Sequence, residues 1–138
     1  MADEVRRVQY VYVIVKDRPG QAAEVLGALA EEGIDLLAFS GFPAKGGKGQ
    51  LDLVTGDLAG VKRVARSRKW KLSAVKRGFL VQGDDRVGAV AGILGKLARA
   101  KINVIAADAV SAGAGRYAMI LWVKPASYAR AAKVLEAR

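Results

Sequence analysis

The chain of 138 residues contains an internal repeat, which constrains its fold more strongly than any other feature of the sequence. When the sequence is shifted by 68 residues against itself, residues 17–36 align with residues 85–104 without a gap. Nine of the twenty aligned positions are identical, whereas chance at this composition would give about two. The identities include the pairs Asp17/Asp85, Arg18/Arg86, Gly20/Gly88, Leu29/Leu97 and Ile34/Ile102. We therefore expect two copies of one structural unit, over residues 8–77 and 78–138.

Hydrophobic periodicity predicts the same order of elements in both copies. The first copy is predicted to have strands over residues 10–15, 34–40, 50–55 and 71–75, with helices over 21–33 and 58–69 and a glycine-rich hairpin loop over 41–49. The second copy is predicted to have strands over residues 79–82, 102–110 and 117–123, with helices over 87–100 and 127–137. The resulting fold class is α+β, with two ferredoxin-like βαββαβ units whose helices cover one face of an antiparallel sheet.

The second copy lacks the residues for its own C-terminal strand, because the sequence ends with the final predicted helix. In the βαββαβ topology the fourth strand pairs with the first, so one edge of the second sheet needs another partner. We consider three: a second chain, an extended N-terminal strand over residues 5–15, or a displaced strand. Two thin sheets also favour a homodimer, which would bury more apolar surface.

Two glycines lie in the middle of the leading helices. Gly27 and Gly95 occupy equivalent positions in the repeat, and a glycine in a helix costs about 1 kcal/mol relative to alanine. Because both copies keep it, we expect each glycine to allow close packing of the helix against a sheet or another helix.

The loops that open the leading helices carry a recognisable motif. Residues 17–20 read Asp-Arg-Pro-Gly and are followed by Ile34–Asp35–Leu36, whereas residues 85–88 read Asp-Arg-Val-Gly and are followed by Ile102–Asn103–Val104. In this strand–helix–strand context both copies resemble the ACT domain. The resemblance covers about residues 8–138 and is similar to that of stand-alone tandem ACT proteins without an enzyme domain.

The resemblance implies a regulatory or sensor protein that binds a small ligand, usually an amino acid, between units. The ligand contacts it implies are the first loop and the start of the second strand, which in this chain are Asp17, Arg18, Pro19, Gly20 and Asp35 in the first copy and Asp85, Arg86, Val87, Gly88 and Asn103 in the second. A regulated protein partner is implied as well.

These residue types suit a zwitterion. The unpaired N–H groups and positive dipole end of a helix N-terminus attract a carboxylate, and a glycine there lets the ligand approach the backbone. Asp17 or Asp85 can accept hydrogen bonds from an ammonium group, and Asn103 can both donate and accept. The alternative interpretation is structural, since Asp-Arg-Pro-Gly also makes a sound turn into a helix.

Composition argues against catalysis and cofactors. The chain has no histidine and no cysteine, which excludes disulfides, typical zinc and iron–sulfur sites and every triad that needs an imidazole base. We therefore expect no enzyme activity, no metal and no cofactor. No apolar run is long enough to span a membrane and no signal peptide is evident, so we expect a soluble, cytoplasmic protein.

The charge is strongly basic and unevenly distributed. The formal net charge is +10, and residues 62–77 contain eight basic and no acidic side chains. The alternative to a sensor is therefore an interaction protein with structural loops, whose basic face meets an acidic partner or nucleic acid. Because no RNA-binding signature accompanies the basic residues, we favour a solvated basic helix over a nucleic-acid surface.

Overall fold

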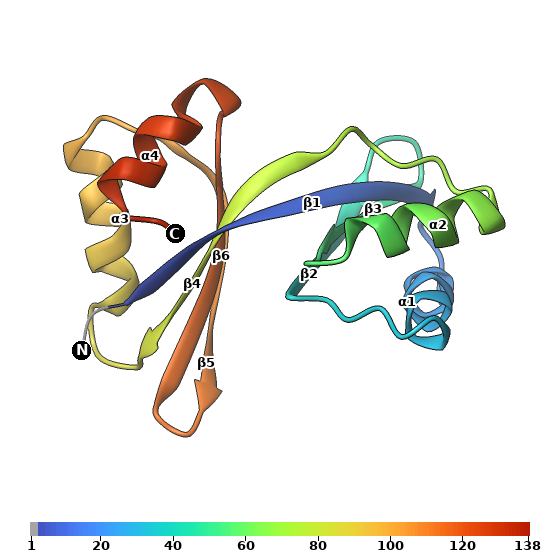
Figure 1. Cartoon of the computed structure of the whole chain (residues 1–138), viewed down its shortest axis with the longest axis horizontal. Helices are drawn as coiled ribbons and strands as arrows, with labels where there is room; N and C mark the ends of the chain where they lie inside the picture. The colour runs from blue at the N-terminus through green and yellow to red at the C-terminus, as the bar shows by residue number, and fades with distance from the viewer. Residues whose placement is uncertain (1–2) are drawn as a thin grey trace. The chain divides into compact units, whose positions relative to one another are not determined.

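The computed structural model describes residues 3–138, which divide into two compact units (Figure 1). The N-terminal unit comprises Gln9–Lys76. The C-terminal unit comprises the described residues up to Val8 together with Arg77–Arg138.

The N-terminal unit has a sheet with two helices on one face. Its elements are, in chain order, β1 (Glu4–Lys16), α1 (Gln21–Glu31), β2 (Ala38–Ala44), β3 (Lys48–Val54) and α2 (Leu58–Arg68). The strands are antiparallel in the order β2-β3-β1. Alternate residues of β1 and β3 pack against the apolar sides of α1 and α2 to form one core, which includes Val11, Val13, Val25, Leu29, Leu53, Val61 and Val64.

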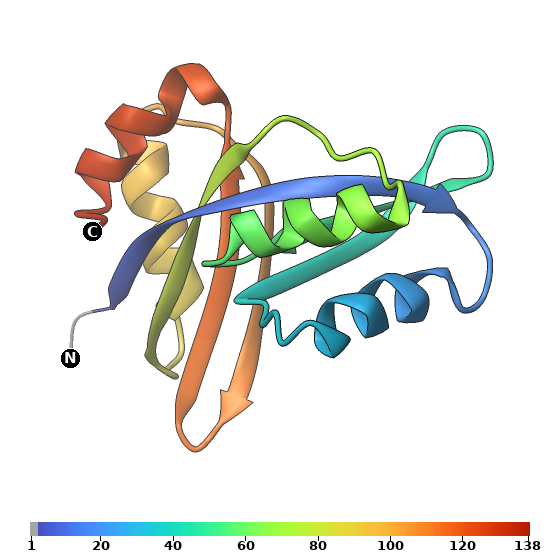
Figure 2. The same cartoon turned by 45° about the vertical axis from the view of Figure 1, so that its right-hand side comes forward.

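The C-terminal unit repeats this arrangement. Its elements are β4 (Lys76–Asp84), α3 (Ala89–Arg99), β5 (Val104–Gly113), β6 (Arg116–Val123), a short 3₁₀ turn (Pro125–Ser127) and α4 (Tyr128–Val134). Its own strands are antiparallel in the order β5-β6-β4, and its core includes Phe79, Val81, Ile93, Leu97, Met119, Leu121 and Tyr128. The predicted α+β class and βαββαβ-type units are confirmed. Figure 2 shows the β5–β6 hairpin extending beyond the helices of its unit.

The repeat is visible in the backbone hydrogen bonds as well as in the sequence. The N–H of Ile34 donates to the carbonyl of Leu29 at 3.0 Å, and the equivalent N–H of Ile102 donates to Leu97 at 2.9 Å. This bond reaches back five residues and is typical of a helix that ends with a left-handed residue. Gly33, with φ 71°, ends α1 as predicted.

The extended N-terminal strand, one of the three predicted possibilities, is the partner of the C-terminal unit's open edge. β1 is 13 residues long and lies next to both β3 and β4 in the strand order. Its first residues belong to the same unit as β4. The chain end adds two further bonds to it, from the N–H of Arg7 to the carbonyl of Arg138 at 2.8 Å and from the N–H of Arg138 to that of Val5 at 2.9 Å.

The predicted strand over residues 71–75 is wrong. Only an isolated bridge between Leu72 and Val13 forms there. Ser73 explains how the backbone is satisfied without a strand, because its hydroxyl accepts from the N–H of Tyr12 at 2.9 Å and its own N–H donates to the carbonyl of Tyr12 at 2.9 Å. A side chain therefore replaces part of the ladder.

The predicted hairpin loop over residues 41–49 is too long. β2 continues to Ala44 and β3 begins at Lys48, so the turn is only residues 45–47. Gly46 and Gly47 have φ of 72° and 70°, values that favour glycine and allow a tight turn with the hand of the flanking strands.

The predicted close packing at the mid-helix glycines is also wrong. A Cβ at Gly27 would meet no atom within 4 Å, and one at Gly95 would meet only the flexible end of Arg99 at 3.3 Å. Gly20 differs from both, because its φ of 91° lies in the left-handed region, which residues with a Cβ atom rarely adopt.

These geometries predict opposite effects of one substitution at two places. Gly27→Ala should raise the free energy of unfolding by about 0.5–1 kcal/mol, because alanine has the better helix propensity and meets no obstacle. Gly20→Ala should lower it by about 1–2 kcal/mol through backbone strain. Urea unfolding curves measure both, and a destabilising Gly27→Ala would contradict the open environment of α1.

Candidate functional site

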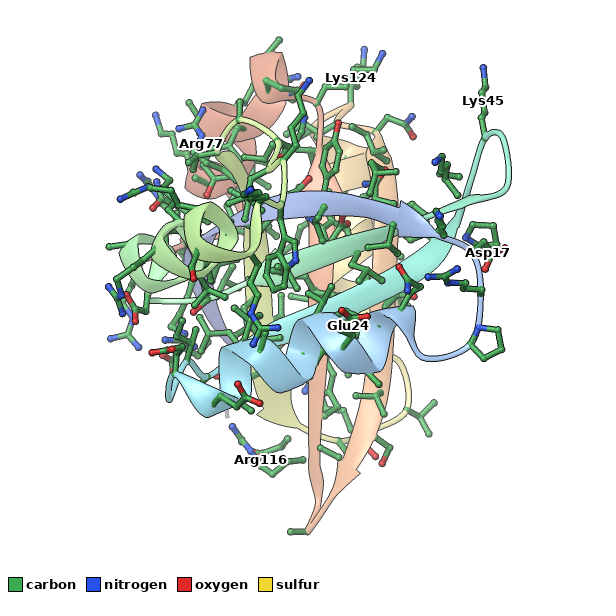
Figure 3. The ribbon with its side chains drawn as sticks, turned by 90° about the vertical axis from the view of Figure 1, so that its right-hand side faces the viewer. Asp17, Glu24, Lys45, Arg77, Arg116 and Lys124 are labelled. Atoms are coloured by element: carbon green, nitrogen blue, oxygen red, sulfur yellow. The ribbon has the colours of Figure 1, made fainter. Side chains whose placement is uncertain are left out.

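Both predicted loops lead from a strand directly into the first turn of a helix. Gly20 precedes α1 with φ 91°, and Gly88 precedes α3 with φ 84°. Asp17 and Asp85 anchor the loops through their backbone, because the N–H of Asp17 donates to Gly47 at 3.0 Å and that of Asp85 to Gly115 at 2.8 Å. The two loops are therefore built alike. Figure 3 shows Asp17 in the loop after β1.

The helix starts at these loops remain available for a ligand. Neither α1 nor α3 has a side chain that hydrogen-bonds to its first turn. The residues of both loops, Asp17, Arg18, Pro19, Gly20, Asp85, Arg86, Val87 and Gly88, are all exposed. Uncapped N–H groups at the positive end of a helix dipole are suited to an anionic group such as a carboxylate.

A hollow of about 320 Å³ lies beside the first loop. Its walls come from the end of β1, the first turns of α1, the start of β3 and the segment after α2, and are lined by Val13, Ile14, Val15, Lys16, Arg18, Gln21, Glu24, Val25, Lys48, Lys69, Trp70 and Lys71. Among the described residues, the side chains of Asp17 and Arg18 have no hydrogen bond or ion pair. Of the two, Arg18 lines the hollow, whereas Asp17 lies in the loop beside it.

A second hollow, of about 410 Å³, lies beside the second loop. It is lined by Asp85, Arg86, Gly88, Ala89, Val90, Ala91, Ala109, Val110, Ser111 and Tyr117, which makes most of its wall apolar. Its Asp85 carboxylate already accepts a hydrogen bond from the Ser111 hydroxyl at 2.8 Å. The second hollow thus differs from the first in two ways: its wall is more apolar, and its aspartate already accepts a hydrogen bond from the protein.

Arg86 is held by an internal ion pair. Its guanidinium donates to both carboxylate oxygens of Asp3 at 3.2 Å and to the carbonyl of Asp84 at 2.8 Å. Burial raises the pKa of Asp3, but the Arg86 guanidinium, the nearby Tyr117 hydroxyl and the charge of Lys96 together outweigh burial, so that the pKa lies below its ordinary value. Arg18, the equivalent residue in the first loop, has no such partner within the described chain.

Tyr117 is one of the residues that line the second hollow. It is 3% exposed, and its hydroxyl meets no partner at hydrogen-bonding geometry among the described residues. Burial, followed by the nearby Asp3 carboxylate, raises the pKa of Tyr117 to about 12. The hydroxyl is therefore a neutral donor at physiological pH.

Asp35 and Asn103 do not lie with the loops of their own units. Asp35 follows the far end of α1, a helix of 11 residues that spans about 16 Å. Its carboxylate accepts from the N–H of Leu36 at 3.0 Å, and neither Asp35 nor Asn103 lines a hollow described above. One unit alone therefore cannot bring the loop and the following strand start onto the same small ligand.

Several residues of the two hollows were missed by sequence reasoning. Lys48, Lys69 and Trp70 join the first hollow, whereas Ser111 and Tyr117 join the second. Lys69 and Trp70 stand in or beside the basic segment noted in the sequence, but nothing in that segment indicates that it lies beside the first loop.

Neither a cluster of metal-binding side chains nor a membrane-spanning helix is found among the residues that the structure describes. No group of three or more carboxylate, histidine or cysteine side chains there lies close enough to hold a metal ion. None of the helices there is both long and apolar enough to cross a membrane.

Residues 9–69 match the model of the ACT domain. The match lies within the N-terminal unit, Gln9–Lys76, and includes its first loop. It confirms the predicted resemblance over this part of the chain. No curated protein sequence matches the chain.

Solved structures with the ACT-like fold extend the similarity over both units. Protein BT0572 from Bacteroides thetaiotaomicron is 15% identical with a TM-score of 0.82, and the alignment covers 96% of this chain and 88% of that one. The ligand-free regulatory subunit of aspartate kinase from Thermus thermophilus is 20% identical with a TM-score of 0.61, covering 98% and 93%. The corresponding subunit from Thermus flavus is 19% identical with a TM-score of 0.58, covering 98% and 94%.

The Asp3–Arg86 pair makes a prediction about pH. Because the pKa of Asp3 is lowered in the folded state, the carboxylate stabilises the fold above its unfolded pKa of about 3.9, and this contribution disappears as the pH falls through the folded value. Asp3→Asn should therefore lower the urea midpoint at pH 7 and lower it less at pH 3, because part of the contribution is lost below the unfolded pKa. An equal decrease of the midpoint at both pH values would show that the ion pair is not the cause.

Proposed function

We propose that this protein is a non-catalytic regulatory module that senses a small effector, most simply a free amino acid, at its strand-to-helix loops. The observation that supports this proposal most directly is the matching geometry of the two loops. Each combines a left-handed glycine, a helix start without a side-chain cap, an aspartate and an adjacent hollow. The similarity of fold to aspartate kinase regulatory subunits is consistent with it.

The loop chemistry suits the two ends of an amino acid. The carboxylate would lie at the helix N-terminus, where the N–H groups and dipole favour negative charge. The ammonium group would be bound by Asp17 in the first loop, whose carboxylate lacks a partner among the described residues. Two or three charged hydrogen bonds of roughly 1.5–3 kcal/mol each are enough for micromolar binding.

Asp35 and Asn103 enter this proposal through assembly. Because each lies a helix length from its own loop, a ligand that touches the start of a second strand must take it from another unit. We propose a homodimer in which ligand binding favours one arrangement of subunits for a regulated protein partner. The regulatory effect is then a population shift, and its size is limited by the difference in ligand affinity between the two arrangements.

A thermal-shift panel with the twenty amino acids tests ligand binding. One or a few amino acids at millimolar concentration should raise the melting temperature, since a ligand that binds only the folded state stabilises it by about 2.7 kcal/mol at a concentration of 100 Kd. Asp17→Asn should abolish the shift if the first loop binds, and Asp85→Asn if the second does. A flat panel would contradict the proposal.

The matched control is Glu32→Gln. It removes the same charge as the two loop variants, but Glu32 is exposed beyond the far end of α1 and lines neither hollow. The ligand shift should survive in this variant. Loss of the shift in all three variants would indicate a dependence on net charge and not on the loops.

Dimerisation is tested separately. Sedimentation equilibrium should give the mass of two chains of 14.6 kDa at micromolar concentration. The exposed apolar side chains on and beside the sheet-edge strands, Phe39 and Phe42 on β2 and Ile105 and Val110 on β5, are the surfaces we expect to be covered. A monomer at high protein concentration would contradict the dimer while leaving loop binding open to its own test.

A further inference from the structure

The hollow beside the first loop has an unusual balance of charge. Five cationic side chains line it, namely Lys16, Arg18, Lys48, Lys69 and Lys71, against the single carboxylate of Glu24, which Figure 3 shows on α1. Among the described residues, none of the five makes a side-chain hydrogen bond or ion pair. Within residues 3–138 this positive charge is therefore balanced only in part, by Glu24.

The repeat shows that this charge is a particular property of the first unit. Lys16 on β1 lies directly opposite Lys48 on β3. The residues 68 positions later, Asp84 on β4 and Arg116 on β6, are also directly opposite each other. In the C-terminal unit this pair forms a salt bridge of 2.8 Å.

One position of the fold thus carries an attractive pair in one unit and a repulsive pair in the other. Like charges directly opposite each other on neighbouring strands destabilise a sheet. The C-terminal unit demonstrates that the same backbone accepts an ion pair there. A pair of lysines at a place where the fold accommodates an ion pair points to an anion that is not part of the chain.

The remaining lining of the hollow is rich in hydrogen-bond donors. Ammonium and guanidinium groups and the indole N–H of Trp70 can only donate, and Gln21 can donate as well as accept. A ligand that fits must therefore offer mainly acceptors. Glu24 is the exception, since it can accept from an ammonium group on such a ligand.

We infer that the N-terminal hollow binds a compact small molecule carrying at least two negative charges, such as a dicarboxylate or a phosphate compound. The inference rests on the proposed function, because Arg18 belongs to both the loop and the hollow, and it narrows the effector of that loop to an anion. A volume of about 320 Å³ fits a small metabolite and not a polymer. The apolar second hollow, whose Arg86 is held by Asp3, has no such preference.

The decisive variant is Lys16→Asp, which recreates in the first unit the charge pair of the second. It should raise the melting temperature of the ligand-free protein, because an attractive pair with Lys48 replaces a repulsive one. It should also weaken anion binding roughly tenfold or more, the effect expected for loss of a charged hydrogen bond. A merely structural lysine would not link a more stable fold to weaker binding.

Calorimetric titration at constant ionic strength measures the binding. The probes are L-aspartate, succinate and inorganic pyrophosphate, compared with L-threonine, L-lysine and a short oligonucleotide. Binding of L-aspartate alone identifies an acidic amino acid held in part by Glu24, binding of succinate as well identifies a dicarboxylate, and binding of pyrophosphate alone identifies a phosphate compound. Each of these results supports a small ligand with at least two negative charges, whereas binding of L-threonine or L-lysine without any of the three overturns the inference but leaves the proposed function intact.

Two further variants make the result specific to the hollow. Lys62→Asp makes the same change of charge on the exposed side of α2, outside the hollow, and should alter affinity less than about threefold through screened long-range attraction. Lys16→Gln serves if Lys16→Asp does not fold, and should weaken binding in the same direction. Equal losses in Lys16→Asp and Lys62→Asp, or binding only of an oligonucleotide and of none of the small anions, would overturn the inference.

Discussion

The backbone hydrogen bonds of β1 are the constraint on which the rest of the structure depends. A buried strand edge leaves N–H and C=O groups without partners, and unpaired buried groups of this kind are rare in folded proteins. Residues 78–138 supply only three strands to their own sheet, so the first residues of the chain complete it beside β4.

The pairing of β1 with β4 also has an electrostatic consequence. It holds Asp3 at the second loop, where its carboxylate binds the guanidinium of Arg86. The topology therefore pairs the arginine of the second loop with a residue of the chain, whereas the equivalent Arg18 of the first loop has no such partner among residues 3–138.

What sequence reasoning found depends on how local the relevant forces are. The four helices, the turns before the leading helices and the βαββα part of each unit follow from periodicity and backbone preference within short windows, and these predictions were confirmed. The strand over residues 71–75 failed because a side chain, Ser73, took over the role of the strand ladder at Tyr12. The predicted packing at Gly27 failed for a different reason. The presence of glycine at the same helix position in both copies shows that the fold accepts glycine there. It does not show whether another side chain or backbone packs against that position.

The candidate site was predictable to the same extent. The repeat located both loops, because a left-handed glycine before a helix leaves a mark in the sequence. The walls of the hollows were not predictable, since Lys48 and Trp70 reach the first loop only through the register of β3 and the path of the chain after α2. Lys16 and Lys48, which lie opposite each other on β1 and β3, illustrate what the sequence alone cannot predict. The sequence aligns Lys16 with Asp84, but only the strand register shows that each faces the residue with which its charge interacts.

Duplication allows the two copies to use the same backbone in opposite ways. In the C-terminal unit the charged groups near the loop are matched with one another: Asp84 with Arg116, Asp3 with Arg86, and Asp85 with Ser111. An external ligand there must compete with bonds that already exist. In the N-terminal unit the equivalent groups repel one another or have no partner in the described part of the chain, so that an anion would relieve an existing electrostatic cost as well as form new contacts. Differential interaction of this kind is what a ligand needs in order to shift a conformational equilibrium. Under the proposed function we therefore expect the two units to differ in their response to a ligand although they share a fold, and we expect the stability of the N-terminal unit to depend on what it binds.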